Sequence, residues 1–114
     1  MELKETVYDL AKQLSDKKAV DISIIHIGER ASFADYFINA TAGSDRQLDA
    51  LTDVIEDRAA ELGLPLRGAE GKVGSGWTLI DCGDIIVNIF TAAQRERYSL
   101  DKIWSDCDTE TFEE

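Results

Sequence analysis

The spacing of the apolar residues switches between the helical and the strand period, and this switching constrains the fold more than any other feature of the chain. From Leu3, apolar residues recur at i, i+4, i+7, i+8 and i+11, which predicts a helix over about residues 2–17. From Val20, β-branched residues alternate with polar ones, which predicts a strand over 20–27. A second strand is predicted over 36–41. The chain is thus expected to begin with a helix and two strands.

A second helix, predicted over about residues 45–62, has sequence signals at both ends. Ser44 and Gln47 have the spacing of an N-terminal capping box, and Gly63 is a typical residue just beyond a helix C-terminus. Three further strands and one or two short helices are predicted at about 66–70, 77–81, 84–91 and 92–104. This order predicts a single α/β domain, in which helices pack on a mixed sheet of about five strands.

Length and charge limit the organisation and the partners. The chain has 114 residues, which suits one domain over residues 1–105 followed by an acidic tail over 106–114. We expect the tail to be disordered, because acids predominate in it. Twenty-three acidic and 12 basic residues give a net charge of −11. Such a surface disfavours sequence-specific nucleic-acid binding and suits a basic protein partner, although solubility alone also explains it.

The chain carries no sign of export or of a membrane. Its apolar runs are only a few residues long, and its N-terminus lacks the basic and apolar regions of a signal peptide. Cys82 and Cys107 do not have the spacing of a metal site. We therefore expect a cytoplasmic protein with reduced thiols.

Most candidate catalytic residues have simpler explanations. His26 is the only histidine and lies in an apolar strand, so we expect a structural role and no histidine metal site. Ser44 is explained by helix capping without a nucleophilic role. The loop Gly71–Gly76 lacks the Gly-Lys-Ser/Thr ending of a phosphate-binding loop and precedes a strand instead of a helix.

A set of carboxylates is the sharpest catalytic candidate. Asp45 begins a predicted helix, while Asp81 and Asp84 flank a tight turn between two strands. Together they would hold magnesium for phosphoryl transfer, which makes a metal-dependent nucleotidyltransferase the alternative function. Aspartate is also common beside tight turns without any catalytic role. We expect no catalytic residue, no metal and no cofactor.

Large aromatic residues near acids indicate a recognition surface. Trp77, Tyr98 and Trp104 are the candidates, because buried aromatic anchors dominate many protein interfaces. Trp104 has helical spacing with Leu100, which favours a core position. Trp77 follows Gly76, and both a core position and an exposed one remain open for it.

Short motifs over nearly the whole chain resemble those of one family. They are Ser32-Phe33-Ala34-Asp35-Tyr36-Phe37, Ala40-Thr41, Arg46-Gln47, Glu70-Gly71, Gly76-Trp77, Leu79-Ile80-Asp81, Gly83-Asp84, Ile86-Val87, Ile89-Phe90, Arg95 with Tyr98, and Leu100 to Trp104. This combination resembles the ribosomal silencing factor family, also called Iojap-related proteins. Asn88 departs from the histidine that is common at its position in the family, and the turn at 42–45 departs as well.

The resemblance implies a nucleotidyltransferase-like α/β fold without transferase chemistry. It implies binding to the large ribosomal subunit through ribosomal protein L fourteen, a block on association with the small subunit, and repression of translation when nutrients are short. It also suggests a homodimer in isolation. We expect the partner-binding face to comprise Glu70, Trp77, Leu79, Asp81, Asp84 and Tyr98, where the family motifs are dense and acids would meet a basic protein.

Overall fold

The computed structural model describes residues 2–28, 32, 34–66, 68–70, 76–98 and 107–112. The elements in chain order are α1 (Leu3–Asp16), β1 (Val20–His26), β2 (Tyr36–Ala42), α2 (Asp45–Glu61), β3 (Gly68–Glu70), β4 (Trp77–Asp81), β5 (Ile85–Thr91), α3 (Ala92–Tyr98) and β6 (Thr109–Thr111). The predicted order of helices and strands is confirmed through α3. The predicted helical residues beyond α3, with Leu100 and Trp104, lie outside the described residues.

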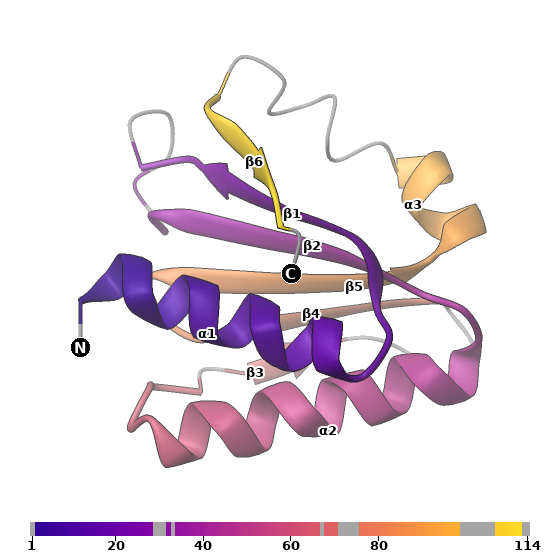
Figure 1. The fold of residues 1–114 in the computed structure, drawn as a ribbon, viewed down its shortest axis with the longest axis horizontal. Coiled ribbons are helices and arrows are strands. Elements are labelled where there is room, and N and C mark those ends of the chain that lie inside the picture. Colours follow the sequence, from indigo (N-terminus) through magenta and orange to yellow (C-terminus); the bar gives the residue numbers. More distant parts are fainter. Residues whose placement is uncertain are drawn as a thin grey trace.

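The strands form one mixed sheet in the order β3-β4-β5-β2-β1-β6 (Figure 1). β2 and β5 are parallel, and every other pair of neighbours is antiparallel. β5 therefore lies beside β2, although α2, β3 and β4 separate the two strands in the chain. The predicted single α/β domain with a mixed sheet is confirmed.

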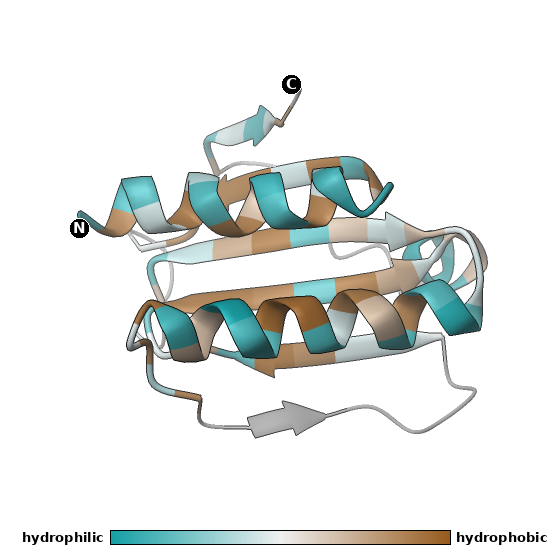
Figure 2. Cartoon of the chain, turned by 60° about the horizontal axis from the view of Figure 1, so that its bottom comes forward, coloured by the Kyte–Doolittle hydropathy of each residue, from teal (hydrophilic) through white to brown (hydrophobic). Residues whose placement is uncertain are grey.

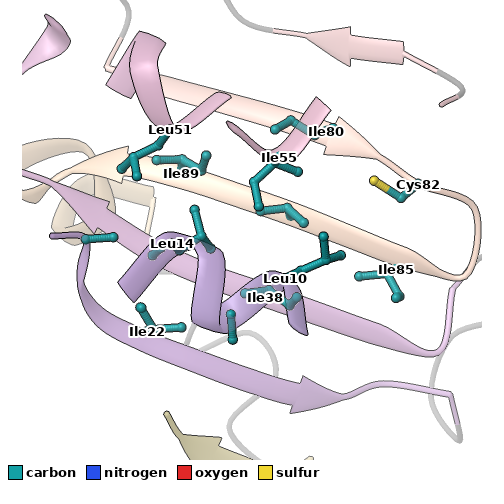
Figure 3. Close-up of a cluster of buried hydrophobic side chains, with 14 of the residues drawn as sticks. Leu10, Leu14, Ile22, Ile38, Leu51, Ile55, Ile80, Cys82, Ile85 and Ile89 are labelled. Atoms are coloured by element: carbon teal, nitrogen blue, oxygen red, sulfur yellow. The ribbon is translucent and has the colours of Figure 1, made fainter. Parts of the chain in front are cut away.

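Helices α1 and α2 lie side by side on one face of the sheet (Figures 1 and 2). Their apolar stripes pack on the side chains that alternate toward them from the strands, and these residues form the larger core. Fully buried members drawn in Figure 3 are Leu10 and Leu14 of α1, Leu51 and Ile55 of α2, and Ile38, Ile80, Ile85 and Ile89 of the strands. The helical periodicity of the sequence thus indicates which side of each helix packs on the sheet.

A smaller apolar cluster lies on the other side of the sheet. Its buried members are Ile25, Ile27, Ala34, Phe37 and Ile86, with Leu79 and Cys107 packed against it. Strands β2 and β5 are consequently buried on both faces. This explains why β5 is almost continuously apolar in sequence and does not alternate.

Both ends of α2 follow the sequence signals. The Ser44 hydroxyl accepts a hydrogen bond from the Gln47 N–H at 3.1 Å, and the Gln47 side chain accepts one from the Gly43 N–H. Gln47 also donates to the Lys17 carbonyl at 3.0 Å, which ties the start of α2 to the end of α1. Gly63 has a φ of +72°, the left-handed conformation expected just after a helix.

The expected disorder of the C-terminal tail is wrong for residues 107–112. Thr109–Thr111 form β6, a sixth strand at the edge of the sheet beside β1 (Figure 1). The prediction from composition failed because contacts with β1 and α1, which are distant in sequence, order this segment, and not the propensity of its own residues. The half-buried Phe112 packs against the larger core and supplies apolar contact that a purely acidic segment would lack.

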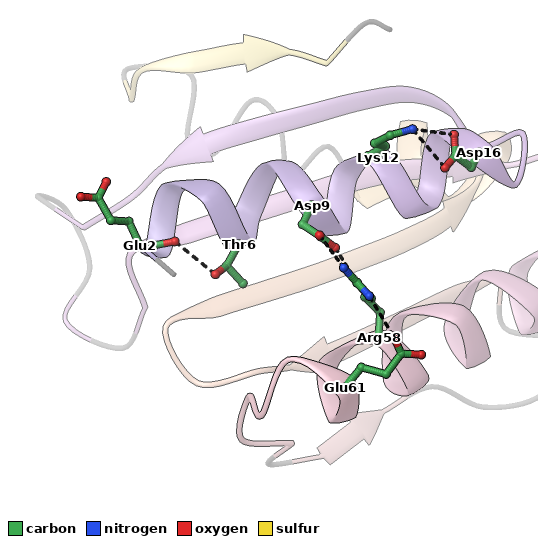
Figure 4. Close-up of polar contacts among 7 residues, drawn as sticks. All are labelled: Glu2, Thr6, Asp9, Lys12, Asp16, Arg58 and Glu61. Atoms are coloured by element: carbon green, nitrogen blue, oxygen red, sulfur yellow. Dashed lines mark hydrogen bonds and ion pairs between the residues drawn. The ribbon is translucent and has the colours of Figure 1, made fainter.

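A bidentate ion pair connects the two helices (Figure 4). The Arg58 guanidinium donates to both oxygens of Asp9 at 2.7 and 2.8 Å and to Glu61 at 2.8 Å. The hydrogen bonds from Arg58 lower the pKa of Asp9. Both members of the Asp9–Arg58 pair are less than one-third exposed, so solvent screens this pair less than an open surface pair.

We expect Asp9→Asn to lower the free energy of unfolding by about 1 kcal/mol at neutral pH. Because the pKa of Asp9 is lowered on folding, its stabilisation is present above the unfolded-state pKa and is lost as the pH falls through the folded-state value. Urea unfolding at pH 7 and at about pH 2 should show the difference between variant and parent shrink in acid. Asp16→Asn, in the exposed Lys12–Asp16 pair, is the control and should cost less. An equal or larger loss in this control would contradict the assignment.

Candidate partner-binding face

Three of the expected partner-binding residues lie on one face of β4. Trp77, Leu79 and Asp81 alternate along the strand, so their side chains share a face, and all three are partly exposed. Leu79 packs against the smaller apolar cluster, which places this face on the side of the sheet away from α1 and α2. Trp77 and Asp81 lie about 13 Å apart along the strand. The three side chains form a strip along β4.

Trp77 is half-buried, and a ring contact and a hydrogen bond hold it in place. Its ring stacks on Phe90 with the centroids 5.4 Å apart, and its indole N–H donates to the Asn88 side-chain oxygen at 3.2 Å. Asn88 in turn donates to the side-chain oxygen of Asn39 at 3.1 Å, and both asparagines are buried. Trp77 is therefore neither a fully buried core residue nor a freely presented one. It is anchored at one edge and partly accessible.

Gly76 explains how the chain enters β4 at Trp77. Its φ is +77°, and a Cβ there would lie 2.6 Å from Cγ of Gln94 and 2.8 Å from Oγ1 of Thr91. Its carbonyl accepts a hydrogen bond from the Thr91 N–H at 2.8 Å. The sequence marked Gly76 only as the end of a glycine-rich loop, but the fold favours glycine there, because φ is positive and side chains of β5 and α3 approach its backbone closely. The rest of that loop lies outside the described residues.

Asp81 and Asp84 occupy the turn between β4 and β5. Oδ1 of Asp81 accepts from the Gly83 N–H at 2.9 Å, and Gly83 has a φ of +87°. The Asp84 carbonyl accepts from the N–H groups of Asp35 and Tyr36 at 2.8 and 3.1 Å, while the residue itself is exposed. The turn-forming interpretation of Asp81 is confirmed. Asp84 remains on the surface at the end of the strip.

The structure places only the backbones of the other two expected residues. Glu70 pairs with Leu79 across β3 and β4, so its backbone lies beside the strip. Tyr98 is the last residue of α3. Their side chains, and the whole of Trp104, lie outside the described residues.

Sequence reasoning missed the polar contacts of this side of the sheet. Arg95 of α3 donates to the Asp21 carbonyl, to Oγ1 of Thr41 at 3.0 Å and to Oγ of Ser23 at 3.2 Å. These contacts tie α3 to β1 and β2. Their partners lie more than 50 residues away, so no local pattern reveals them.

The strands do contain a signal for the asparagine pair. Asn39 and Asn88 each interrupt an apolar run, and they are paired in register across β2 and β5. A polar residue within a buried strand must find a partner, because burying an unpaired amide is costly. The sequence therefore indicated that each asparagine needs a partner, but not which one.

Strand direction separates the residues of the alternative magnesium site. The parallel pairing places Tyr36 beside Ile85 at one end and Ala42 beside Thr91 at the other. Asp81 and Asp84 belong to the first end and Asp45 to the second, about 20 Å away. They cannot share a metal ion, so this proposed carboxylate set is wrong. Among the residues that the structure describes, no group of three or more His, Cys, Asp and Glu side chains could hold one.

The histidine and the serine are separated in the same way. His26 pairs with Tyr36 at the first end of the sheet, whereas Ser44 follows β2 at the second. Nε2 of His26 lies 3.1 Å from Glu110, and its ring packs edge-on against Tyr36 with centroids 4.8 Å apart. These contacts agree with a structural histidine and leave no Ser44–His26 pair for nucleophilic chemistry.

Neither described cysteine forms a disulfide. Cys82 is buried and Cys107 is partly exposed. Burial raises the pKa of the Cys82 thiol to about 11, so this thiol is protonated at neutral pH and is a poor nucleophile. No helix in the described part of the chain is long and apolar enough to cross a membrane.

Comparisons with known proteins agree with the motifs and the fold. The family model described as "Ribosomal silencing factor during starvation" matches residues 1–114. A ribosomal silencing factor of Bacillus subtilis is 34% identical over 106 residues, covering 93% of this chain and 90% of that protein. The chloroplastic protein Iojap of Zea mays is 33% identical over 85% of this chain and 42% of that protein.

Solved structures show the same fold. A crystal structure of a protein from Chromobacterium violaceum superposes with a TM-score of 0.88 at 30% identity, covering 92% of this chain and 88% of that one. A second, from Bacillus halodurans, has a TM-score of 0.80 at 28% identity and covers 95% and 99%. The relatives are named for a regulatory role and not for an enzymatic reaction. By sequence and by fold, the chain belongs to the ribosomal silencing factor family.

Proposed function

We propose that this protein binds the large ribosomal subunit through ribosomal protein L fourteen, blocks association with the small subunit and thereby represses translation, especially under nutrient limitation. It acts in the cytoplasm, without substrate or cofactor, and forms a homodimer in isolation. The observation that carries the proposal is the family match over all 114 residues. The net charge of −11 adds support, because it suits a basic protein surface better than a phosphate backbone.

The proposal is tested with purified subunits. The chain should sediment with large subunits and not with small ones, and preincubation should lower the light scattering that reports the joining of the two. Loss of either effect would contradict the proposal. Calorimetry with magnesium and each nucleoside triphosphate should show no micromolar binding, because Asp45 lies about 20 Å from Asp81 and Asp84. Light scattering that gives a monomeric mass at high micromolar concentration would contradict the dimer.

The partner-binding face in this proposal comprises Glu70, Trp77, Leu79, Asp81, Asp84 and Tyr98. Trp77 and Leu79 supply partly exposed apolar surface. The exposed Asp84 supplies negative charge at the end of the strip. An apolar centre with charge at its rim is the usual anatomy of a protein interface.

Charge reversal at the rim should act mainly on the rate of association. We expect Asp84→Lys to slow binding to large subunits about threefold to tenfold at low salt and to flatten its salt dependence, because an exposed charge steers encounter. Stopped-flow association at several salt concentrations measures this. Asp49→Lys, an equal reversal at an exposed position on α2, is the matched control. Equal slowing in both variants would indicate a net-charge effect and contradict the placement of Asp84 at the rim.

A further inference from the structure

The outer edge of β1 receives the C-terminal segment through main-chain hydrogen bonds. β6 pairs with β1 in antiparallel register, with Ile24 opposite Glu110. The pairing extends beyond the strand at both ends, because the His26 N–H donates to the Asp108 carbonyl and the Phe112 N–H to the Ile22 carbonyl, each at 2.8 Å. Without this segment, β1 would be an edge strand with a row of unpaired backbone groups.

Two side chains of the segment make specific contacts on the α1 side of the sheet. The Tyr8 hydroxyl donates a hydrogen bond to one oxygen of Glu110, and Nε2 of His26 lies 3.1 Å from the other oxygen. The Phe112 ring lies 6.5 Å from the Tyr8 ring, and it packs against the larger core. The Lys4 ammonium lies 5.9 Å above the Tyr8 ring and adds positive charge near Glu110.

The environment of Glu110 favours its charged form. The hydrogen bond from Tyr8, and after it the contact with His26, lower the pKa of Glu110. The groups around this carboxylate are thus donors or cations from α1 and β1. A neutral side chain of the same shape would lose the charge-assisted part of these interactions.

We propose that the outer edge of β1, together with Tyr8 and His26, is a recognition site for an extended acidic segment with a glutamate two residues before an aromatic residue, and that the chain occupies this site with its own C-terminal segment. The mode is strand addition, in which main-chain bonds provide affinity and alternate side chains provide specificity. β5 and β2 separate this edge from β4, so the site is distinct from the proposed ribosome-binding face.

The covalent connection explains why so short a strand stays bound. A tethered segment has an effective local concentration in the millimolar range. A few backbone hydrogen bonds and the side-chain contacts of Glu110 and Phe112 therefore suffice to keep it bound. The same segment supplied as a separate peptide would compete poorly with the intact one. It should bind once the chain's own Glu110 and Phe112 contacts are weakened.

The test uses the full chain and a labelled peptide of residues 107–114 with serine in place of Cys107. We expect Glu110→Gln to raise the amide exchange rate of His26 about tenfold, because this amide is bonded to the segment. Asp49→Asn, which removes an exposed acid on α2, is the matched control and should leave that rate unchanged. Fluorescence anisotropy should detect peptide binding to the variant Glu110→Gln with Phe112→Ala but little binding to the parent chain.

Specificity is tested from both sides of the contact. A peptide in which both Glu110 and Phe112 are replaced by alanine should not bind, and Tyr8→Phe in the double-variant background should weaken binding of the intact peptide. Unchanged His26 exchange in Glu110→Gln would overturn the proposal. So would the absence of peptide binding to a folded double variant. If the double variant does not fold, the isosteric Glu110→Gln chain replaces it in the peptide assay, and the same outcomes decide.

Discussion

Trp77→Ala should weaken binding to the large ribosomal subunit at least about thirtyfold at 25 °C. Truncating a central aromatic anchor commonly costs about 2 kcal/mol or more of binding free energy, and about 1.4 kcal/mol corresponds to tenfold. Trp77 suits this role because it is partly exposed, while Phe90 and Asn88 hold its ring in one orientation. An anchor that is already ordered loses less entropy on binding. Co-sedimentation across a range of subunit concentrations measures the change.

The same contacts make folding the essential control. Trp77→Ala removes the stacking on Phe90 and takes the indole donor from the buried Asn88, so some loss of stability is expected even if the interface is correctly placed. Trp77→Phe keeps an aromatic ring that can stack on Phe90 but loses the indole donor and part of the ring area. It should retain most of the binding if ring area provides the affinity. Intact co-sedimentation of the alanine variant would contradict this placement of the interface.

Leu51→Ala should lower the free energy of unfolding by about 3 kcal/mol and the melting temperature by roughly 10–20 °C. Leu51 is a residue of α2 and is fully buried on the side of that helix that packs on the strands in the larger core (Figure 3). The loss combines the transfer free energy of the deleted atoms with the cavity left in a close-packed interior. Thermal and urea unfolding followed by circular dichroism measure it.

Leu66→Ala is the matched control for this substitution. The deletion is chemically identical, but Leu66 is 43% exposed, so the expected change is within about 0.5 kcal/mol. Equal losses in the two variants would contradict the assignment of Leu51 to the core.

Leu51→Ala also serves as a control in the binding experiment with Trp77→Ala. Leu51 packs on the face of the sheet opposite to Trp77, Leu79 and Asp81, so the folded variant should still bind large subunits, and destabilisation alone should not mimic the effect of Trp77→Ala.

Local patterns in the sequence determined the helices and strands. Ser44 and Gln47 predicted the start of α2, and Gly63 predicted its end, because capping and left-handed backbone depend on near neighbours in the chain. The tight turn at Asp81 was predictable for the same reason. The family motifs, which span nearly the whole chain, led to the family.

The tertiary structure decided which of these elements meet. The parallel pairing of β2 with β5 placed Asp45 and Asp81 at opposite ends of the sheet and removed the alternative metal site. It also brought Asn39 to Asn88, which in turn holds Trp77. The two residues of each hydrogen-bonded pair, Asn39 with Asn88 and Asn88 with Trp77, lie more than ten residues apart in the chain. Residue type and short-range spacing therefore could not identify them.

The C-terminal segment shows the same division most clearly. The sequence shows that this segment is rich in acidic residues, and that composition predicted disorder. It forms a strand because its backbone pairs with the edge of β1 and because Tyr8 and His26 contact the carboxylate of Glu110. Local preferences come from each residue and its near neighbours, so the sequence alone determined the helices and turns. Hydrogen bonds and burial between distant segments form only when the whole chain is folded, and so only the tertiary structure decided the sheet order, the partners of Trp77 and the fate of the tail.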